Sequence, residues 1–164
     1  MRTDLSGVDV TIPFETHMVN VGNLYYVSYV VTGSAALRSI LFRVGAKPLH
    51  ISMELKAGLA TPKVLKEGVA VTVAGTALDR RNHNRRYNDN DTLVTVFTGA
   101  TYTGGTIIKS NQAGFGTTPG LADSGEGDGG SNYIFKENTD YAIEFTPTAA
   151  ADTVFIASFY EEVG

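Results

Sequence analysis

A chain of 164 residues with 43% hydrophobic and only 18% charged residues has the apolar content of one folded domain and not of a disordered segment. It contains no cysteine, which excludes disulfides, thiolate metal ligands and thiol nucleophiles in this sequence. Its formal net charge of −4 argues against general nucleic-acid affinity, because phosphate-binding domains are normally basic. No apolar run reaches the roughly 20 residues that cross a bilayer, and the first residues lack a signal-peptide core, so we expect no membrane association and no export.

Residues 1–14 differ from the rest of the sequence, and we expect them to form an extended arm or a short edge strand. Within them Val8, Val10 and Ile12 alternate with polar residues, as in a half-buried strand. Terminal segments are poorly ordered unless something holds them, and in an assembly a neighbouring subunit does so. Residues 15–164 have the length of a single β-sandwich domain.

Alternation of apolar and polar residues, the period of a β-strand, recurs along this domain. The clearest example is 49–56, where four apolar residues alternate with four polar ones. The segment 24–31 is apolar at nearly every position, which predicts a strand buried on both faces. The other predicted strands are 40–44, 69–73, 92–98, the region of Ile107 and Ile108, 133–135, 141–145 and 154–160.

These strands and the turns between them predict the fold class. No stretch of twelve or more residues keeps the apolar spacing of a helix, and 34–38 forms one helical turn at most. The polar residues 136–140 predict a hairpin with a five-residue loop. Eight or nine strands with turns every roughly 8–12 residues predict an all-β, antiparallel β-sandwich or barrel, of which the jelly roll is one member. An immunoglobulin-like sandwich and an open barrel fit the same strand count.

The segment 79–91 concentrates basic and amide side chains in one predicted loop. Four of the thirteen basic residues fall within seven positions, and asparagines flank them: Arg80, Arg81, Asn82, Asn84, Arg85 and Arg86. Guanidinium groups form bidentate pairs with carboxylates, and asparagines donate and accept hydrogen bonds, so this loop is suited to contact a partner protein. Two alternatives stay open. One is a solvated loop whose arginines are balanced by Asp79, Asp89 and Asp91, and the other is a contact with nucleic acid.

Several other patterns resemble chemical sites without matching them. The run Asp89-Asn90-Asp91 offers oxygen ligands for calcium but lacks the spacing, glycine and closing glutamate of an EF-hand. The glycine-rich segment 114–132 contains no Lys, unlike a phosphate-binding P-loop, and we interpret it as a long loop that a partner orders. The three histidines lack metal-ligand spacing, and no Gly-x-Ser-x-Gly motif occurs. We therefore predict no catalytic residue, no metal site and no cofactor.

Aromatic residues on the predicted strands allow two interpretations. The set is Tyr25, Tyr26, Tyr29, Phe155, Phe159 and Tyr160. Burial in the core or in a subunit interface is the ordinary role of such residues. A sugar-binding face requires independent support, namely a row of exposed rings.

Three segments in roughly the C-terminal 90 residues resemble a pattern of tailed-phage virion proteins. They are Gly75-Thr76-Ala77-Leu78 with the following arginine-rich loop and 92–98, the run Ile-Phe-Lys-Glu-Asn-Thr-Asp-Tyr-Ala-Ile-Glu-Phe-Thr at 134–146, and the closing strand 156–161. Together they resemble the capsid cement or decoration proteins of tailed bacteriophages. The sequence departs from that pattern at Glu137, where the family has proline.

The resemblance implies a jelly-roll structural protein of the virion, made in the host cytoplasm and bound to the capsid exterior. Its partners would be the major capsid protein and itself, as a homotrimer that stabilises the mature head. The arginines of 80–86 are then expected to contact the capsid, with the segment from Arg2 to Phe14 as a second contact. An alternative function is a carbohydrate-binding or head-fibre adhesin domain that recognises a host glycan.

Overall fold

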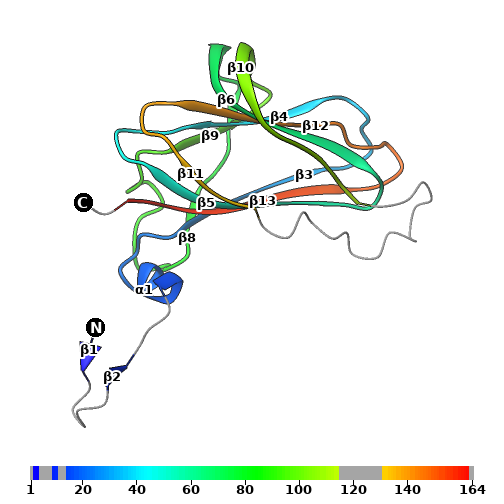
Figure 1. The fold of residues 1–164 in the computed structure, drawn as a ribbon. Helices are drawn as coiled ribbons and strands as arrows, with labels where there is room; N and C mark the ends of the chain where they lie inside the picture. The colour runs from blue at the N-terminus through cyan, green and yellow to red at the C-terminus, as the bar shows by residue number, and fades with distance from the viewer. Residues whose placement is uncertain (1, 4–8, 11–13, 115–130, 163–164) are drawn as a thin grey trace.

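The computed structural model describes residues 2–3, 9–10, 14–114 and 131–162 (Figure 1). Most of the glycine-rich segment 114–132 lies outside the described residues, as do Val8 and Ile12 of the predicted arm. The described elements are β1 (Arg2–Thr3), β2 (Asp9–Val10), α1 (Phe14–Asn20), β3 (Tyr25–Val31), β4 (Arg38–Arg43), β5 (Leu49–Ala57), β6 (Thr61–Val73), β7 (Thr76–Ala77), β8 (Arg81–Asn82), β9 (Thr95–Thr98), β10 (Thr101–Ala113), β11 (Ser131–Phe135), β12 (Asp140–Phe145) and β13 (Thr153–Glu161).

Eight of these strands form two antiparallel sheets with the strand order of a jelly roll. Counted along the chain they are β3, β4, β5, β6, β10, β11, β12 and β13. The first, eighth, third and sixth lie side by side in one sheet, as β3-β13-β5-β11. The second, seventh, fourth and fifth form the other, as β4-β12-β6-β10. This double Greek key confirms the predicted jelly-roll-like β-sandwich.

The connection between β6 and β10 adds short strands to this framework. Within it β9 pairs with β4 and β7 pairs with β9, so the sheet that contains β4 has six strands. The strand β8 pairs with β3 and extends the other sheet to five strands. The predicted loop 79–91 therefore lies at an edge of the five-stranded sheet. At the N-terminus β1 and β2 pair with each other in a separate two-stranded sheet.

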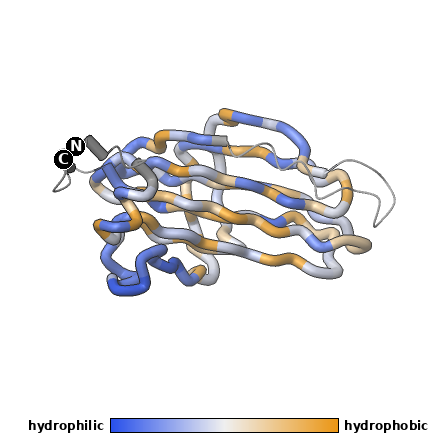
Figure 2. Tube along the Cα trace, turned by 90° about the horizontal axis from the view of Figure 1, so that it is seen from below, coloured by the Kyte–Doolittle hydropathy of each residue, from blue (hydrophilic) through white to orange (hydrophobic). Residues whose placement is uncertain are grey.

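The core lies between the sheets and is largely aromatic. Alternate residues of β5 and β13 point inward, and Figure 2 shows the resulting bands of apolar and polar residues along the strands. The Phe42 ring on β4 packs edge-on against Phe135, Phe155 and Phe159, with ring centroids 6.1–6.3 Å apart. These contacts join strands of both sheets, because Phe42 belongs to the six-stranded sheet and its three partners to the other.

The predicted burial of both faces of β3 was wrong. Tyr25, Val27 and Val31 are buried in the core, whereas Val30 on the opposite face is 56% exposed. A sandwich has only two layers, so each sheet keeps one solvated face whatever its apolar content. Single apolar residues on such a face are common in folded proteins.

The predicted hairpin around 136–140 was also wrong. The strands on either side of it do not pair, since β11 pairs with β5 and β12 pairs with β4 and β6. Residues 136–139 instead cross from one sheet to the other. At the crossing the Phe135 ring stacks on the Tyr141 ring, with centroids 3.8 Å apart.

The six-stranded sheet carries a second, smaller core on its outer face. Leu41 and Ala142 point outward from their strands and are nevertheless buried. Val69 is buried with them, and Phe97 and Tyr102 pack against this cluster. The long pair of β6 and β10 supplies part of the cover as it rises from the sheet (Figure 1).

A helix, α1, precedes β3 where no helix was predicted. Its end is a Schellman motif: the Asn23 N–H donates to the Met18 carbonyl at 2.9 Å, and the Gly22 N–H donates to the Val19 carbonyl at 3.0 Å. Gly22 adopts a φ of 71°, as the motif requires. Seven residues are too few for apolar spacing to reveal a helix. The available signals were Pro13 before it and Gly22 after it.

Candidate functional site

Residues 79–91, the arginine loop, are anchored to the sandwich through β8. In β8, Arg81 pairs with Tyr26 and Asn82 pairs with Tyr25 on β3. Asn82 is fully buried, and its side chain donates to the Gly22 carbonyl at 2.7 Å. Its side-chain oxygen accepts the Asn84 N–H at 2.9 Å. Asn82, predicted as a contact residue, therefore holds the loop against the end of α1.

Asp89 is the centre of the loop's charge network. Its carboxylate accepts the Asn82 backbone N–H at 2.7 Å, Arg85 Nη1 at 2.6 Å and Arg81 Nη1 at 3.0 Å. The backbone hydrogen bond, and then the two guanidinium groups, lower the pKa of Asp89 to about 2. Arg81 also pairs with Asp79 at 3.1 Å. Asp79 and Asp89 thus balance two of the arginines, as the solvated-loop alternative supposed.

The remaining two arginines differ from each other. Arg80 turns toward the protein, where its guanidinium donates to the carbonyls of Thr92 and Val94 and to the side chain of Asn90. Arg86 is exposed, and its guanidinium forms no ion pair or hydrogen bond with another residue in the described part of the chain. Of the four arginines, Arg86 is the one whose guanidinium group is engaged by no other described residue.

The other predicted contact residues lie on the α1 side of the loop or at the N-terminus. Asn84 bridges the loop to α1, because its side chain donates to the Asn20 carbonyl at 3.4 Å. Phe14 is the first residue of α1, and Arg2 lies in β1. Their role in binding stays a prediction.

The outer face of the five-stranded sheet contains a feature that the sequence did not reveal, a groove of about 730 Å³. We call it the outer-face groove. The residues that line it are Leu24, His50, Ile51, Ser52, His83, Asn132, Tyr133, Ile134, Ser158 and Tyr160. Most of them belong to β5, β11 and β13. Leu24 directly precedes β3, and His83 directly follows β8. These segments are far apart in sequence, so no local motif marks the groove.

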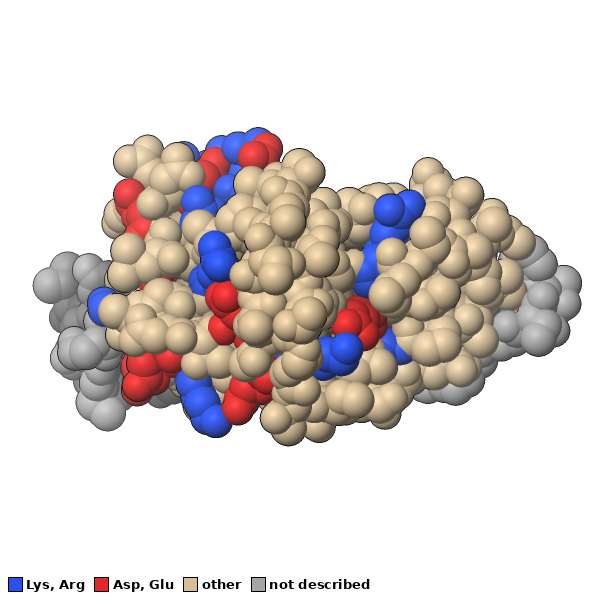
Figure 3. Space-filling model, turned by 90° about the horizontal axis from the view of Figure 1, so that it is seen from above, with Lys and Arg blue, Asp and Glu red and all other residues tan. Residues whose placement is uncertain are grey.

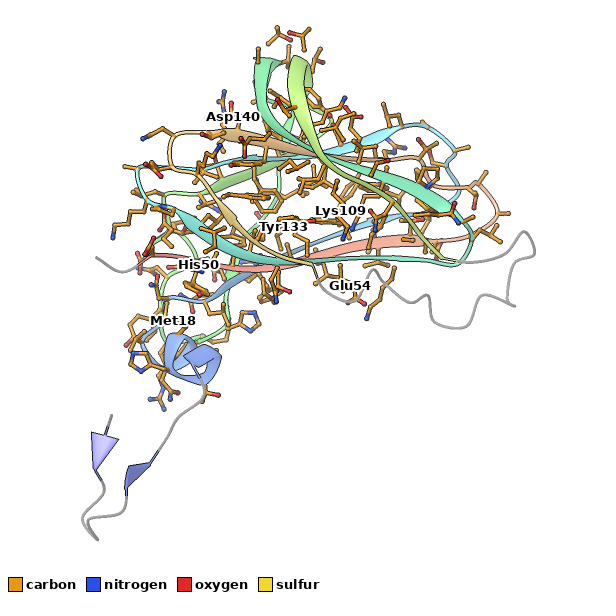
Figure 4. The ribbon with its side chains drawn as sticks, in the orientation of Figure 1. Met18, His50, Glu54, Lys109, Tyr133 and Asp140 are labelled. Carbon is orange, nitrogen blue, oxygen red and sulfur yellow. The ribbon has the colours of Figure 1, made fainter. Side chains whose placement is uncertain are left out.

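The register of the strands explains the shape of this groove. One row across the sheet contains Ile134, His50 and Tyr160, each opposite the next on a neighbouring strand. The adjacent row contains Asn132, Ser52 and Ser158. Serines are small, so the second row forms a hollow beside the ring-bearing first row. His50 and Glu54 are seen in Figure 4 to point away from the core on this face.

Aromatic rings stand at two places along the groove. The His50 and Tyr160 rings stack with centroids 4.6 Å apart and planes at 13°. The His83 and Tyr26 rings meet edge to face at 5.0 Å. Partial desolvation lowers the pKa of His83. Of the six aromatic residues considered for a sugar-binding face, Tyr25, Phe155 and Phe159 are core residues and Tyr29 packs against the core. Tyr26 is exposed, and Tyr160 is half-buried.

The described residues of the two sheets pack closely against each other. Within the described part of the sandwich, the cavity lined by Lys63, Lys109 and Tyr133 measures about 10 Å³, room for about one water molecule. Lys109 and Tyr133 lie between the two sheets in Figure 4. Among residues 14–114 and 131–162, no cluster of three His, Asp or Glu side chains is placed to hold a metal ion. Ligand-sized space is therefore found on the outside of this sandwich.

On the face that carries the six-stranded sheet, charges of opposite sign lie next to one another (Figure 3). Lys66 pairs with Glu144 at 2.7 Å, and Lys136 pairs with Glu67 at 2.7 Å. Such mixing gives no continuous basic surface for a nucleic-acid backbone. In the described segments, no helix has the length and apolar content to span a membrane.

Comparison with known proteins adds little to this picture. No family model matches the chain, and no curated protein matches it. Among solved structures, the crystal structure of infectious bursal disease virus VP2 subviral particle aligns with 84% of this chain at 10% identity. The chain covers 42% of that viral chain, and the TM-score is 0.14. A similarity this weak carries no argument about fold or function.

Proposed function

We propose that this protein is a capsid decoration protein, which binds the outer surface of the major capsid lattice of a tailed phage and stabilises the mature head. The observation that carries the proposal is the jelly-roll strand order around a filled aromatic core. Jelly rolls recur in viral capsid proteins, and a filled core leaves the outer surfaces to bind partners. The resemblance of 75–98, 134–146 and 156–161 to phage decoration proteins supports the same function.

The mechanism follows from binding equilibrium alone. A protein that binds only the assembled, expanded lattice adds its binding free energy to that state and none to dissociated subunits. A specific contact of this kind buries roughly 1,200–2,000 Å² in total. Repeated copies, each a homotrimer in this proposal, would multiply the effect through avidity.

The arginine loop supports a specific version of this contact. Three of its arginines are engaged by Asp79, Asp89 and backbone carbonyls, which fixes the loop before binding. A preorganised loop loses little conformational entropy when it meets a partner. Arg86 then presents an exposed guanidinium that suits a carboxylate on the capsid surface.

The test is cosedimentation with the expanded and unexpanded capsid shells of the phage that encodes this chain. We expect binding to expanded shells, and we expect Arg86→Ser to lower occupancy at least about threefold, the loss of roughly 0.7 kcal/mol. Lys47→Ser, which removes an exposed charge elsewhere, is the matched control. Absence of binding to either shell would reject the proposal, whereas equal occupancy for Arg86→Ser and Lys47→Ser would remove Arg86 from the contact. Sedimentation equilibrium at the mass of three 17.5 kDa chains would support the homotrimer.

A further inference from the structure

We infer that the outer-face groove is a binding site for a neutral carbohydrate. This site is separate from the proposed capsid contact at the arginine loop, and the inference does not rest on it. Its volume of about 730 Å³ falls within the roughly 300–1,000 Å³ of small-ligand sites. A groove of this size is suited to a compact ligand and not to a broad protein surface.

The groove presents aromatic surface to a ligand. A sugar ring presents an apolar C–H face, which packs against the face or edge of an aromatic ring. The His50–Tyr160 stack provides such a surface on β5 and β13, two neighbouring strands within the sheet. Each ring restricts the other, so little conformational entropy remains to be lost when a ligand binds. The Tyr26–His83 pair provides a second ring surface toward the β8 end.

The groove also contains polar side chains that can form hydrogen bonds with a ligand. The hydroxyls of Ser52 and Ser158 and the side-chain amide of Asn132 line the groove. None of these three side chains forms a hydrogen bond with another residue in the described ranges. Hydroxyls and amides both donate and accept, which matches the paired donor and acceptor character of sugar hydroxyls.

The charge of the lining favours an uncharged ligand. No Asp, Glu, Lys or Arg is among the lining residues. A phosphate, a sialic acid or an acidic peptide would find no lysine or arginine among these residues to pair with its charge, which costs binding free energy. An uncharged ligand rich in hydroxyl groups meets both the rings and the polar groups without that cost.

The experiment begins with wild-type protein on an array that carries neutral and sialylated glycans. The neutral glycan with the strongest signal is then titrated into ¹⁵N-labelled protein, with amide shifts followed by NMR. We expect binding of neutral glycans and shift changes that centre on Ser52, Ser158 and His50. If no neutral glycan binds, or if only sialylated glycans bind, the inference is wrong.

Two variants locate the site. Ser158→Tyr fills the hollow and is expected to weaken binding of the neutral glycan at least about tenfold, equal to 1.4 kcal/mol. Ser28→Tyr is the matched control, because Ser28 is exposed on the same face of β3 but does not line the groove. Asn132→Ala removes only an exposed amide and is expected to weaken binding of the neutral glycan several-fold. It replaces Ser158→Tyr as the test if that variant unfolds. The assignment is wrong if Ser158→Tyr binds the glycan with wild-type affinity. If Ser158→Tyr unfolds, wild-type affinity in Asn132→Ala has the same meaning.

The capsid cosedimentation assay separates this inference from the proposed function. We expect Ser158→Tyr to bind expanded shells as wild type does while its glycan binding is lost. If Ser158→Tyr instead loses shell binding and wild type binds no neutral glycan, the groove is a protein contact and the carbohydrate assignment fails. If no shell binds but neutral glycans do, the decoration function fails and the groove assignment stands.

Discussion

Phe135 and Tyr141 stack almost face to face, with ring centroids 3.8 Å apart and planes at 4°, although they belong to different sheets of the sandwich. Both rings are buried. The Tyr141 hydroxyl accepts the Lys136 N–H at 2.9 Å and donates to Glu67 at 2.9 Å. Glu67 also pairs with the Lys136 ammonium group. These contacts fix the crossing between β11 and β12 to β6.

The first prediction concerns the stack itself. Phe135→Ala removes a fully buried ring that contacts Phe42, Tyr133 and Tyr141, so it should cost about 3–5 kcal/mol of unfolding free energy. Urea unfolding followed by circular dichroism measures it. Ile134→Ala, which truncates the exposed neighbour on the same strand, should cost less than about 1 kcal/mol. Equal losses for the two variants would contradict the packing described here.

The second prediction concerns the Tyr141 hydroxyl and alkaline pH. Burial, and the hydrogen bond to Glu67, raise the pKa of Tyr141 to about 12. A raised pKa means that this tyrosine stabilises the fold below its unfolded value of 10, and that the contribution is lost as pH rises through about 12. Unfolding free energy measured across this range should therefore fall less steeply in Tyr141→Phe than in wild type. Identical slopes for both proteins would show that Tyr141 does not titrate with folding.

The crossing also shows what sequence patterns could and could not predict. Alternation at 133–135 and 141–145 correctly placed two strands, because period-two burial depends only on which face meets the core. It does not encode which strand is the neighbour. A short polar connection is compatible with a hairpin or with a crossing between sheets, and the choice depends on Phe135 and Tyr141 meeting across the core. The jelly-roll order was likewise reached through resemblance and not through periodicity.

The third prediction concerns acid pH and the arginine loop. The pKa of Asp89 falls from its ordinary value of 3.8 to about 2, first because of the Asn82 N–H and then because of Arg85 and Arg81. The ionised Asp89 carboxylate therefore stabilises the arginine loop fully above pH 3.8, and this stabilisation is lost as pH falls through about 2. Hydrogen exchange at the Asn82 amide should remain slow down to that range in wild type.

Two variants test this assignment. Asp89→Asn should speed exchange at the Asn82 amide at neutral pH, because it removes the charge that holds both arginines. Asp79→Asn, which contacts Arg81 alone, is the matched control and should leave that amide protected. Fast exchange in both variants, or in neither, would mean that Asp89 is not the centre of the loop.

The fourth prediction concerns the Lys66–Glu144 pair on the six-stranded sheet. The same Glu144 oxygen accepts from Lys66 Nζ at 2.7 Å and from the Tyr102 hydroxyl at 2.8 Å. Both partners of the ion pair are less than a quarter exposed, so solvent screens it only in part. A double-mutant cycle with Lys66→Met and Glu144→Gln should give a coupling free energy of about 1 kcal/mol. The exposed pair Lys56–Glu54 should give less than about 0.5 kcal/mol, and equal couplings would contradict the prediction.

The candidate sites differ in how far the sequence predicted them. The arginine loop is contiguous, so its composition was visible, but the sequence did not distinguish Arg86 from three arginines that serve the loop's own structure. The outer-face groove was not visible, since His50, Ser158 and His83 are brought together only by strand register and by the placement of β8. Histidines without metal-ligand spacing carried no signal in the sequence, yet two of the three line the groove.

The last prediction concerns Gly22, which joins α1 to the arginine loop. Its φ of 71° is strained for other residues, and a Cβ there would lie 2.2 Å from the Tyr87 ring. Gly22→Ala should therefore cost about 1–2 kcal/mol for the backbone and more for displacing Tyr87. In a Tyr87→Ala background only the backbone part should remain, so the same substitution should cost less by urea unfolding. An equal cost in both backgrounds would show that Tyr87 does not pack on Gly22.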